Sequence, residues 1–242
     1  MITELPGTIE PADGDPPPGL AADHPMRAVT RAVAFDPDGW TEERRQQVVA
    51  LFDELADDWS SRDVPGREAP LLDALDRGIA AAPTATRRVA LDIGAGNGLN
   101  TRHLAPHFAV LGTVDISLEM LRHASAAPAV RVQGDASRLP VADRSIDVLV
   151  LANAFLFPAE VDRVLATDGV VVWVSSRGTG TPIHLLPTEV DHALPGPWTG
   201  VSSAAGWGTW SVHWRTSSSG SRAVSEGTCA ATSSYAHPEP QR

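Results

Sequence analysis

The chain has 242 residues, of which 43% are hydrophobic, and its formal net charge at pH 7 is -11. A chain of this length can bury one sizeable α/β core, and its negative charge disfavours nucleic-acid binding, which requires basic patches. No apolar run is long enough to span a bilayer, and residues 1–6 lack the basic and apolar parts of a secretory signal. We therefore expect a cytoplasmic protein that acts without a membrane or a nucleic acid.

Cysteine and histidine usage bears on metal sites and disulfides. The single cysteine, Cys229, allows no intrachain disulfide and no cysteine-rich metal site. The eight histidines are scattered along the chain without a pair at metal-binding spacing. We therefore expect no bound metal.

The first third of the chain divides into two segments. Residues 1–40 are rich in Pro, Gly and Asp and show no periodic apolar pattern, so we predict a flexible leader there. Residues 41–83 are predicted to form two amphipathic helices. The first begins after Thr41, a suitable N-cap, and repeats apolar residues at helical spacing. The second spans residues 69–82 and ends at Pro83.

From residue 88 onward, short apolar runs alternate with helical patterns. The predicted strands span residues 89–93, 109–114, 130–133, 146–151 and 170–174. The predicted helices between them span residues 99–107, 117–126 and 159–166. This alternation is typical of a Rossmann-like, doubly wound and mostly parallel sheet in an α/β domain. Beyond it we expect a helix at residues 187–194, a strand at 206–215 and a disordered tail at 216–242.

A glycine-rich turn, DIGAGNG at residues 92–98, follows the first of these strands. Glycine permits backbone angles that other residues resist and lets a ligand lie against bare backbone. The dinucleotide pattern G-x-G-x-x-G would require glycine at position 99, where this chain has Leu99. The turn therefore predicts a nucleotide-like ligand while disfavouring a nicotinamide dinucleotide.

Carboxylates stand at the ends of three successive predicted strands. Asp92 opens the glycine-rich turn, Asp115 follows the second strand and Asp135 follows the third. In parallel α/β sheets the ligand binds at the carboxyl ends of the strands, and an acid there accepts hydrogen bonds from ribose hydroxyls. Three acids in this arrangement are more specific than the glycine turn alone.

Four ordered blocks of this chain resemble the class I S-adenosylmethionine-dependent methyltransferases, in particular those called methyltransferase type 11. The blocks are residues 89–98, 114–121, 134–140 followed by 145–149, and 160–165. The resemblance covers residues 52–174, with a weaker echo to residue 215. It implies S-adenosylmethionine as cofactor and transfer of a methyl group to a small-molecule acceptor by in-line displacement.

The resemblance also assigns residues to the cofactor. Asp92 and the three glycines would hold its methionine part, Asp115 its ribose and Asp135 the edge of its adenine. The predicted cofactor-binding residues are Asp92, Gly94, Gly96, Gly98, Asp115, Ile116, Asp135, Ala136 and Asn153.

The resemblance further implies an N-terminal helical lid over residues 41–83, followed by the cofactor-binding domain at 84–215. Trp59 and Arg62 are candidates to close over the site, with Arg62 near the cofactor carboxylate. Trp59 has a second interpretation, as an ordinary anchor of the core.

Methyl transfer asks for alignment, desolvation and, for some acceptors, a general base. His184, after the fifth strand, is the candidate base for a hydroxyl acceptor. Two alternatives to a methyltransferase remain open. One is a non-catalytic S-adenosylmethionine-binding module or partner subunit. The other is a nicotinamide-dependent oxidoreductase, which Leu99 and Asp135 disfavour.

Overall fold

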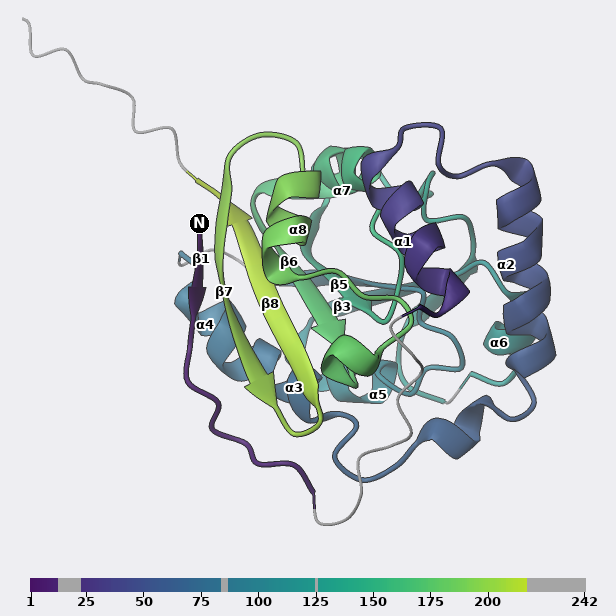
Figure 1. The fold of residues 1–242 in the computed structure, drawn as a ribbon, viewed down its shortest axis with the longest axis horizontal. Coiled ribbons are helices and arrows are strands. Elements are labelled where there is room, and N and C mark those ends of the chain that lie inside the picture. Colours follow the sequence, from purple (N-terminus) through teal and green to yellow (C-terminus); the bar gives the residue numbers. More distant parts are fainter. Residues whose placement is uncertain (13–22, 84–86, 125, 217–242) are drawn as a thin grey trace, which may run out of the picture.

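The structure is a computed structural model, and it describes residues 1–12, 23–83, 87–124 and 126–216. At its centre is an eight-stranded sheet in the order β1-β7-β8-β6-β5-β2-β3-β4 (Figure 1). The strands are β1 (Ile2–Glu4), β2 (Val89–Ile93), β3 (Val110–Asp115), β4 (Val130–Gln133), β5 (Ile146–Ala152), β6 (Leu165–Ser175), β7 (Trp198–Ala205) and β8 (Gly208–Arg215). All pairings are parallel except those of β8 with β6 and β7. The predicted Rossmann-like, mostly parallel sheet is confirmed.

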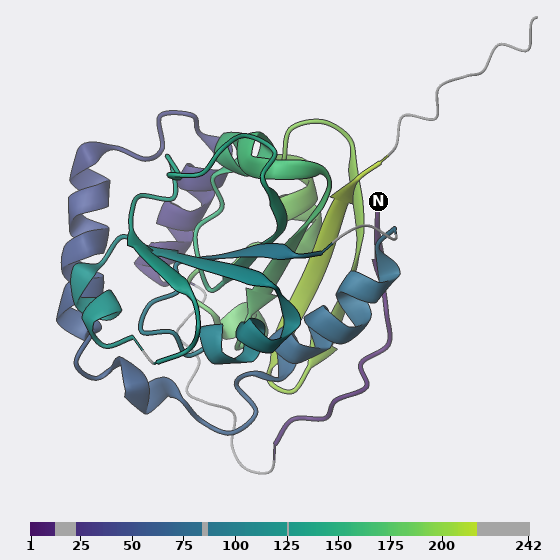
Figure 2. The same ribbon diagram turned by 180° about the vertical axis from the view of Figure 1, so that it is seen from behind.

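Helices cover both faces of this sheet. They are α1 (Pro25–Phe35), α2 (Glu42–Leu55), α3 (Ala69–Asp73), α4 (Ile79–Ala81), α5 (Thr101–Leu104), α6 (Leu118–Arg122), α7 (Pro158–Val164) and α8 (Pro187–Ala193). In Figure 1, α1, α7 and α8 lie on the near face, whereas Figure 2 shows α3 and α4 on the opposite face. A π-helical turn, Ala74–Gly78, joins α3 to α4, and a 3₁₀ turn, Trp59–Arg62, follows α2.

Strand β5 explains why the sheet needs both layers. Its side chains alternate between the two faces: Leu149 and Leu151 pack into the cluster that includes α1, α7 and α8, while Val148 and Val150 pack into the cluster that includes α3. All four side chains are buried. A near-continuous apolar run is what a central strand covered on both faces requires.

Capping residues set two of the helix starts as the sequence predicts. The side chain of Thr41 accepts a hydrogen bond from the backbone N–H of Arg44 at the start of α2. Ser117 does the same for the N–H of Met120 at the start of α6. Such caps satisfy backbone donors that the first helical turn leaves without partners.

The predicted flexible leader at residues 1–40 is wrong in its described part. Residues 2–4 form β1, which pairs with β7, and residues 25–35 form α1. A three-residue edge strand carries no readable alternation. The signal for α1 was present, because Pro25 occupies its first turn and Met26, Thr30 and Val33 are buried at helical spacing.

The predicted helical lid at residues 41–83 also requires a new boundary. Only the start of residues 69–81 lies near strand ends, with Ala69 beside Gly206 and Pro70 beside Gly208. Leu71 and Leu75 instead pack against β6 and β8 through Val172 and Trp210, on the far face of the sheet. Only residues 41–67 remain as a candidate lid.

The end of the chain differs from the prediction at one strand. Strand β7 was missed because its sequence, WTGVSSAA, is rich in small and polar residues. The predicted helix at 187–194 and strand at 206–215 correspond to α8 and β8. Residues 217–242, including Cys229 and nearly all of the predicted disordered tail, lie outside the described residues. None of the described helices has the length and apolar character needed to cross a membrane.

Candidate cofactor-binding site

An open cavity of about 840 Å³ lies at the carboxyl ends of β2, β3, β4 and β5. The structure brings seven of the nine predicted cofactor-binding residues into its lining. They are Gly94, Gly96, Asp115, Ile116, Asp135, Ala136 and Asn153.

The glycine-rich turn forms the floor of this cavity. Gly94 and Gly96 have φ values of 65° and 57°, in the left-handed region that favours glycine. A Cβ atom on Gly94 would lie 2.8 Å from the Cβ of Ala154, and one on Gly96 would lie 3.6 Å from the indole nitrogen of Trp59. Because Ala154 and Trp59 also line the cavity, any side chain at these glycines would take space from a ligand.

Asp115 ties the end of β3 to this turn. One of its carboxylate oxygens accepts the backbone N–H of Gly96 at 2.7 Å, and the other accepts that of Ser117 at 2.8 Å. The side chain is mostly buried, and this burial raises the pKa of its carboxyl group. A carboxylate oxygen has two acceptor sites, so each oxygen retains one for a ribose hydroxyl.

Asp135 has a partner that the sequence analysis missed. The indole N–H of Trp40 is 2.9 Å and 3.1 Å from the two carboxylate oxygens of Asp135. The ring of Trp40 also packs against Phe155 and Phe157, with centroid separations of 5.7 Å and 5.3 Å. Trp40 immediately precedes the cap of α2, a position where an apolar residue often packs against the helix. This placement of a tryptophan before a helix cap is the sequence signal that could have indicated its packing against the site.

Two predicted cofactor residues, Asp92 and Gly98, do not line the cavity. Asp92 is 1% exposed and accepts a hydrogen bond from the hydroxyl of Thr101 at 3.1 Å. Burial raises the pKa of Asp92 to about 7, and the neighbouring charge of Asp115 contributes to the rise. In this structure Asp92 ties the end of β2 to the first residue of α5.

Asn153 follows β5 in a left-handed backbone conformation, with a φ of 57°. Asparagine tolerates this conformation better than most residues. Its side-chain oxygen accepts the backbone N–H of Ser176 at 2.9 Å, and its amide nitrogen donates to the hydroxyl of Ser176 at 3.0 Å. This pair of hydrogen bonds holds the end of β5 beside the end of β6.

A second open cavity, of about 790 Å³, adjoins the first. Five residues line both: Phe52, Trp59, Arg67, Asn153 and Ile183. Among the described residues, the rest of its lining comes from the start of α1, the end of α2, the segment at 59–67 and the segment at 176–183. We refer to the two as the strand-end cavity and the arginine cavity, because the second is lined by Arg62, Arg67 and Arg177.

The segment after α2 lies over the glycine turn and carries the predicted Trp59 and Arg62. The hydroxyl of Ser60 accepts a hydrogen bond from the side chain of Asn97 at 3.0 Å. Asp63 accepts two hydrogen bonds from Arg102, at 2.6 Å and 2.7 Å. These contacts hold the segment against the turn and against α5.

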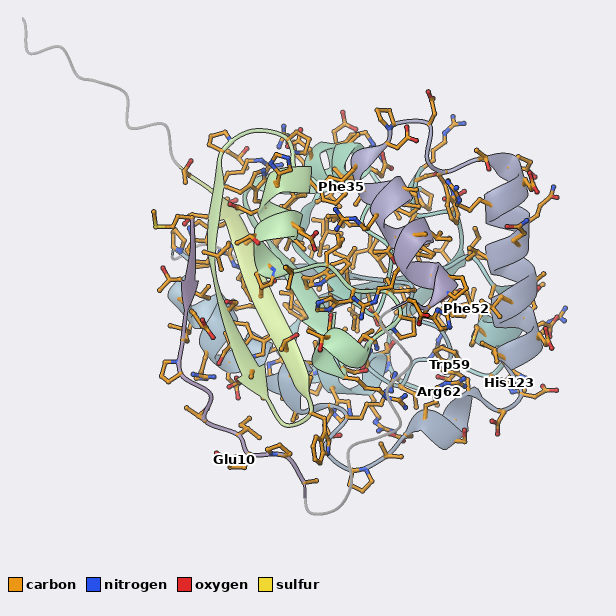
Figure 3. The ribbon with its side chains drawn as sticks, viewed as in Figure 1. Glu10, Phe35, Phe52, Trp59, Arg62 and His123 are labelled. Atoms are coloured by element: carbon orange, nitrogen blue, oxygen red, sulfur yellow. The ribbon has the colours of Figure 1, made fainter. Side chains whose placement is uncertain are left out.

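Figure 3 shows Phe52, Trp59 and Arg62 close together near the end of α2. The guanidinium of Arg62 lies 4.2 Å from the centre of the Trp59 ring, and Phe52 meets that ring edge-on. Trp59 is half-buried and lines both cavities. It therefore contributes to the site as well as to packing.

His184, the candidate base, lines neither cavity. It is buried, and its Nδ1 is 2.9 Å from the hydroxyl of Ser175. Burial lowers the pKa of its imidazole, and the charge of Arg27 lowers it further. The histidine that does line the arginine cavity is His24, whose Nδ1 accepts the N–H of Met26 at 3.2 Å and caps α1.

No group of three or more histidine, cysteine or carboxylate side chains with the arrangement of a metal site occurs within residues 1–12, 23–83, 87–124 and 126–216. The donors around the strand-end cavity instead suit an organic ligand with hydroxyl and amino groups.

A family model described as a methyltransferase domain matches residues 91–172. No curated protein matches the chain. The structure of DhpI with S-adenosylhomocysteine is 19% identical and aligns with 74% of this chain and 100% of its own, with a TM-score of 0.56. This likeness concerns the fold.

Other solved structures align over smaller parts. The YcgJ protein from Bacillus subtilis is 31% identical over 40% of this chain and 47% of its own, with a TM-score of 0.36. A type 11 methyltransferase structure from Sulfolobus solfataricus is 20% identical over 56% of this chain and 88% of its own, with a TM-score of 0.47. The chain thus spans about half the length of the B. subtilis protein. Residues 91–172, from β2 into β6, thus match a methyltransferase-domain family, and they lie within a mostly parallel, Rossmann-like sheet.

Proposed function

We propose that the protein binds S-adenosylmethionine in the strand-end cavity and transfers its methyl group to a small molecule held in the arginine cavity. The observation that carries this proposal is the continuity of the two cavities. They share Phe52, Trp59, Arg67, Asn153 and Ile183, so a ligand in one is adjacent to a ligand in the other. In-line displacement requires such contact between donor and acceptor.

The residues of the strand-end cavity fit the cofactor. The bare backbone at Gly94 and Gly96 leaves room for its methionine part. Asp115 retains acceptor capacity for ribose hydroxyls, and Asp135 retains acceptor capacity for the adenine amino group. When bound, the sulfonium supplies an activated methyl group, so the protein's task is to align the two ligands and exclude water.

Side chains at the junction of the cavities perform that task. Phe52, Trp59 and Ile183 present apolar surface where the ligands meet. Among the described lining residues of the arginine cavity there is no carboxylate, and the Nδ1 of His24 is engaged in capping α1. We therefore propose an acceptor atom that needs no general base from this chain.

The first test is calorimetric titration of the protein with S-adenosylmethionine and S-adenosylhomocysteine. We expect saturable binding that Asp115→Ala weakens about 100-fold or more, because a hydrogen bond to a charged group contributes about 1.5–3 kcal/mol and two are lost. The control is Asp143→Ala, which removes an exposed carboxylate outside both cavities and should leave affinity unchanged.

Two results would separate the alternatives. Absence of binding to well-folded protein would refute the cofactor site. Tight binding without methyl release across an acceptor panel would favour a non-catalytic binding module.

A further inference from the structure

The arginine cavity has an unusual charge distribution for a small acidic protein. Three guanidinium groups line it, those of Arg62, Arg67 and Arg177, and no Asp or Glu is among its described lining residues. The formal charge of the chain is -11. A local excess of positive charge inside a negatively charged protein indicates a specific role for these side chains.

Two of these arginines lack a hydrogen-bonded acid among the described residues. The Nη1 atom of Arg62 is buried and has no hydrogen-bond partner there. The guanidinium of Arg67 makes no hydrogen bond or ion pair to another described residue, and the charge of Asp63 offsets only part of the fall in its pKa. The adjacent acid, Asp63, is engaged by Arg102 through two hydrogen bonds.

The environment of Arg67 shows the cost of this arrangement. Its burial, together with the charges of Arg177 and Arg62, lowers the pKa of the Arg67 guanidinium to about 10. Burying a charge without a partner is unfavourable, and an anion bound beside it relieves the cost. Among the described residues, the charges of Arg62 and Arg67 are thus not balanced by a neighbouring acid, and a negatively charged ligand would balance them.

The carboxylate of the bound cofactor can pair with at most one of these guanidinium groups. Arg67 lines both cavities and is within reach of a ligand in the strand-end cavity. Arg62 lines the arginine cavity and not the strand-end cavity, and its buried Nη1 has no partner among the described residues. A negative group on the acceptor would supply that partner.

We propose that the acceptor carries an oxyanion, such as a carboxylate or phosphate, attached to an apolar body, and that Arg62 and Arg67 bind the oxyanion. The apolar body would pack against Leu51, Leu55 and Pro182. Guanidinium groups suit this role because their planar donors match the oxygens of such anions. This inference rests on the proposed function, since it specifies the acceptor of the same methyl transfer.

The test compares a matched pair of probes, 3-phenylpropanoate and its neutral amide, 3-phenylpropanamide. Each is titrated against the full chain saturated with S-adenosylhomocysteine, so that the cofactor carboxylate is already in place. We expect the acid to bind at least about tenfold more tightly than the amide, as charge-assisted hydrogen bonds to guanidinium imply. The difference should shrink as salt is raised.

Variants then assign the effect to residues. Arg62→Gln should weaken binding of the acid about tenfold without changing that of the amide or of S-adenosylhomocysteine, and Arg62→Lys should restore part of the loss. Arg67→Gln should also weaken binding of the acid. The control is Arg122→Gln, which makes the same charge change on exposed α6, outside both cavities.

Three outcomes would overturn the proposal: equal binding of acid and amide, binding of neither, or an Arg62→Gln variant that loses S-adenosylhomocysteine and acid together. The last result would assign Arg62 to the cofactor carboxylate. The same titrations are repeated without S-adenosylhomocysteine. If that cofactor product fails to bind but the acid still binds through Arg62, the proposed function fails while the oxyanion site remains.

Discussion

The strand-end cavity and the arginine cavity are adjacent but are constructed in different ways. The strand-end cavity is built largely on residues 93–157, where successive parallel strands deliver a glycine turn and two carboxylates to one edge of the sheet. The arginine cavity is assembled from α1, α2, the segment at 59–67 and the segment at 176–183. The first follows from the sheet itself, whereas the second depends on how peripheral segments pack on it.

The two cavities also differ in how their charges are satisfied. The carboxylate of Asp115 already accepts two backbone N–H groups, and that of Asp135 accepts the indole of Trp40. Arg62 has a buried donor atom that finds no partner in the described part of the chain. One site is therefore organised before its ligand arrives, while the other gains its missing interactions from the ligand. Pre-organisation lowers the ordering cost of binding.

The largest expected effect comes from Gly94→Ala, which should affect one cavity and spare the other. A left-handed conformation costs a residue with a Cβ about 1–2 kcal/mol, and the new methyl would lie 2.8 Å from Ala154. We expect S-adenosylhomocysteine affinity to fall about 100-fold by calorimetry. Binding of 3-phenylpropanoate without that ligand should persist.

The matched control for this variant is Gly196→Ala. Gly196 also has a positive φ, 89°, but a Cβ there would meet no atom within 4 Å, and the residue lies outside both cavities. It should lower thermal stability slightly and leave affinity unchanged. Equal losses of affinity in both variants would show that backbone strain alone, and not the shape of the cavity floor, explains the effect.

The next-largest effect is the pH dependence that Asp92 gives to the free energy of unfolding. An aspartate in an unfolded chain has a pKa of about 4, whereas burial raises that of Asp92 to about 7. Between these values the folded state holds the extra proton, so this group makes the protein less stable as pH rises from about 4 to about 7. The cost is complete above that window and disappears below it.

Asp92→Asn should remove this dependence. We expect the variant to exceed the parent protein in free energy of unfolding by on the order of 2–4 kcal/mol near pH 8, with the difference vanishing near pH 4. Denaturant titrations at the two pH values measure it. A difference that does not change with pH would mean that Asp92 does not titrate in this window. Measuring S-adenosylhomocysteine binding alongside shows whether Asp92 also acts on the cofactor, as the resemblance to methyltransferases implies.

The smallest effect is expected from Trp40→Phe. The substitution keeps an aromatic ring against Phe155 and Phe157 but removes the hydrogen bond to Asp135. A hydrogen bond to a charged group contributes about 1.5–3 kcal/mol, and part of this energy orients Asp135 for the cofactor. Cofactor affinity should therefore fall about three- to tenfold, with no change in 3-phenylpropanoate binding. Unchanged cofactor affinity would show that Trp40 only packs beside the site.

The parallel sheet and most of the strand-end cavity could be predicted from local patterns in the sequence. The glycine turn, Asp115 and Asp135 are readable because each has a local signature, a residue type placed directly after an apolar strand. The topology of a parallel sheet then brings strand ends together, so no further contact has to be guessed. Strands β2 to β6 were identified for the same reason. Strands β1 and β7 were missed because they lack a strong periodic pattern, and α1 was missed because the segment before it is rich in proline.

The remaining features of the site depend on contacts between distant parts of the chain. Trp40 and Asp135 are 95 residues apart, and Asn97 and Ser60 are 37 apart, so no local pattern relates them. His184 and Asp92 carry suitable chemistry in the sequence, yet packing encloses both away from the cavities. The arginine cavity also depends on contacts between segments that are far apart in the sequence. Its charges come from separate segments, and their proximity results from how those segments bury their apolar faces against the sheet.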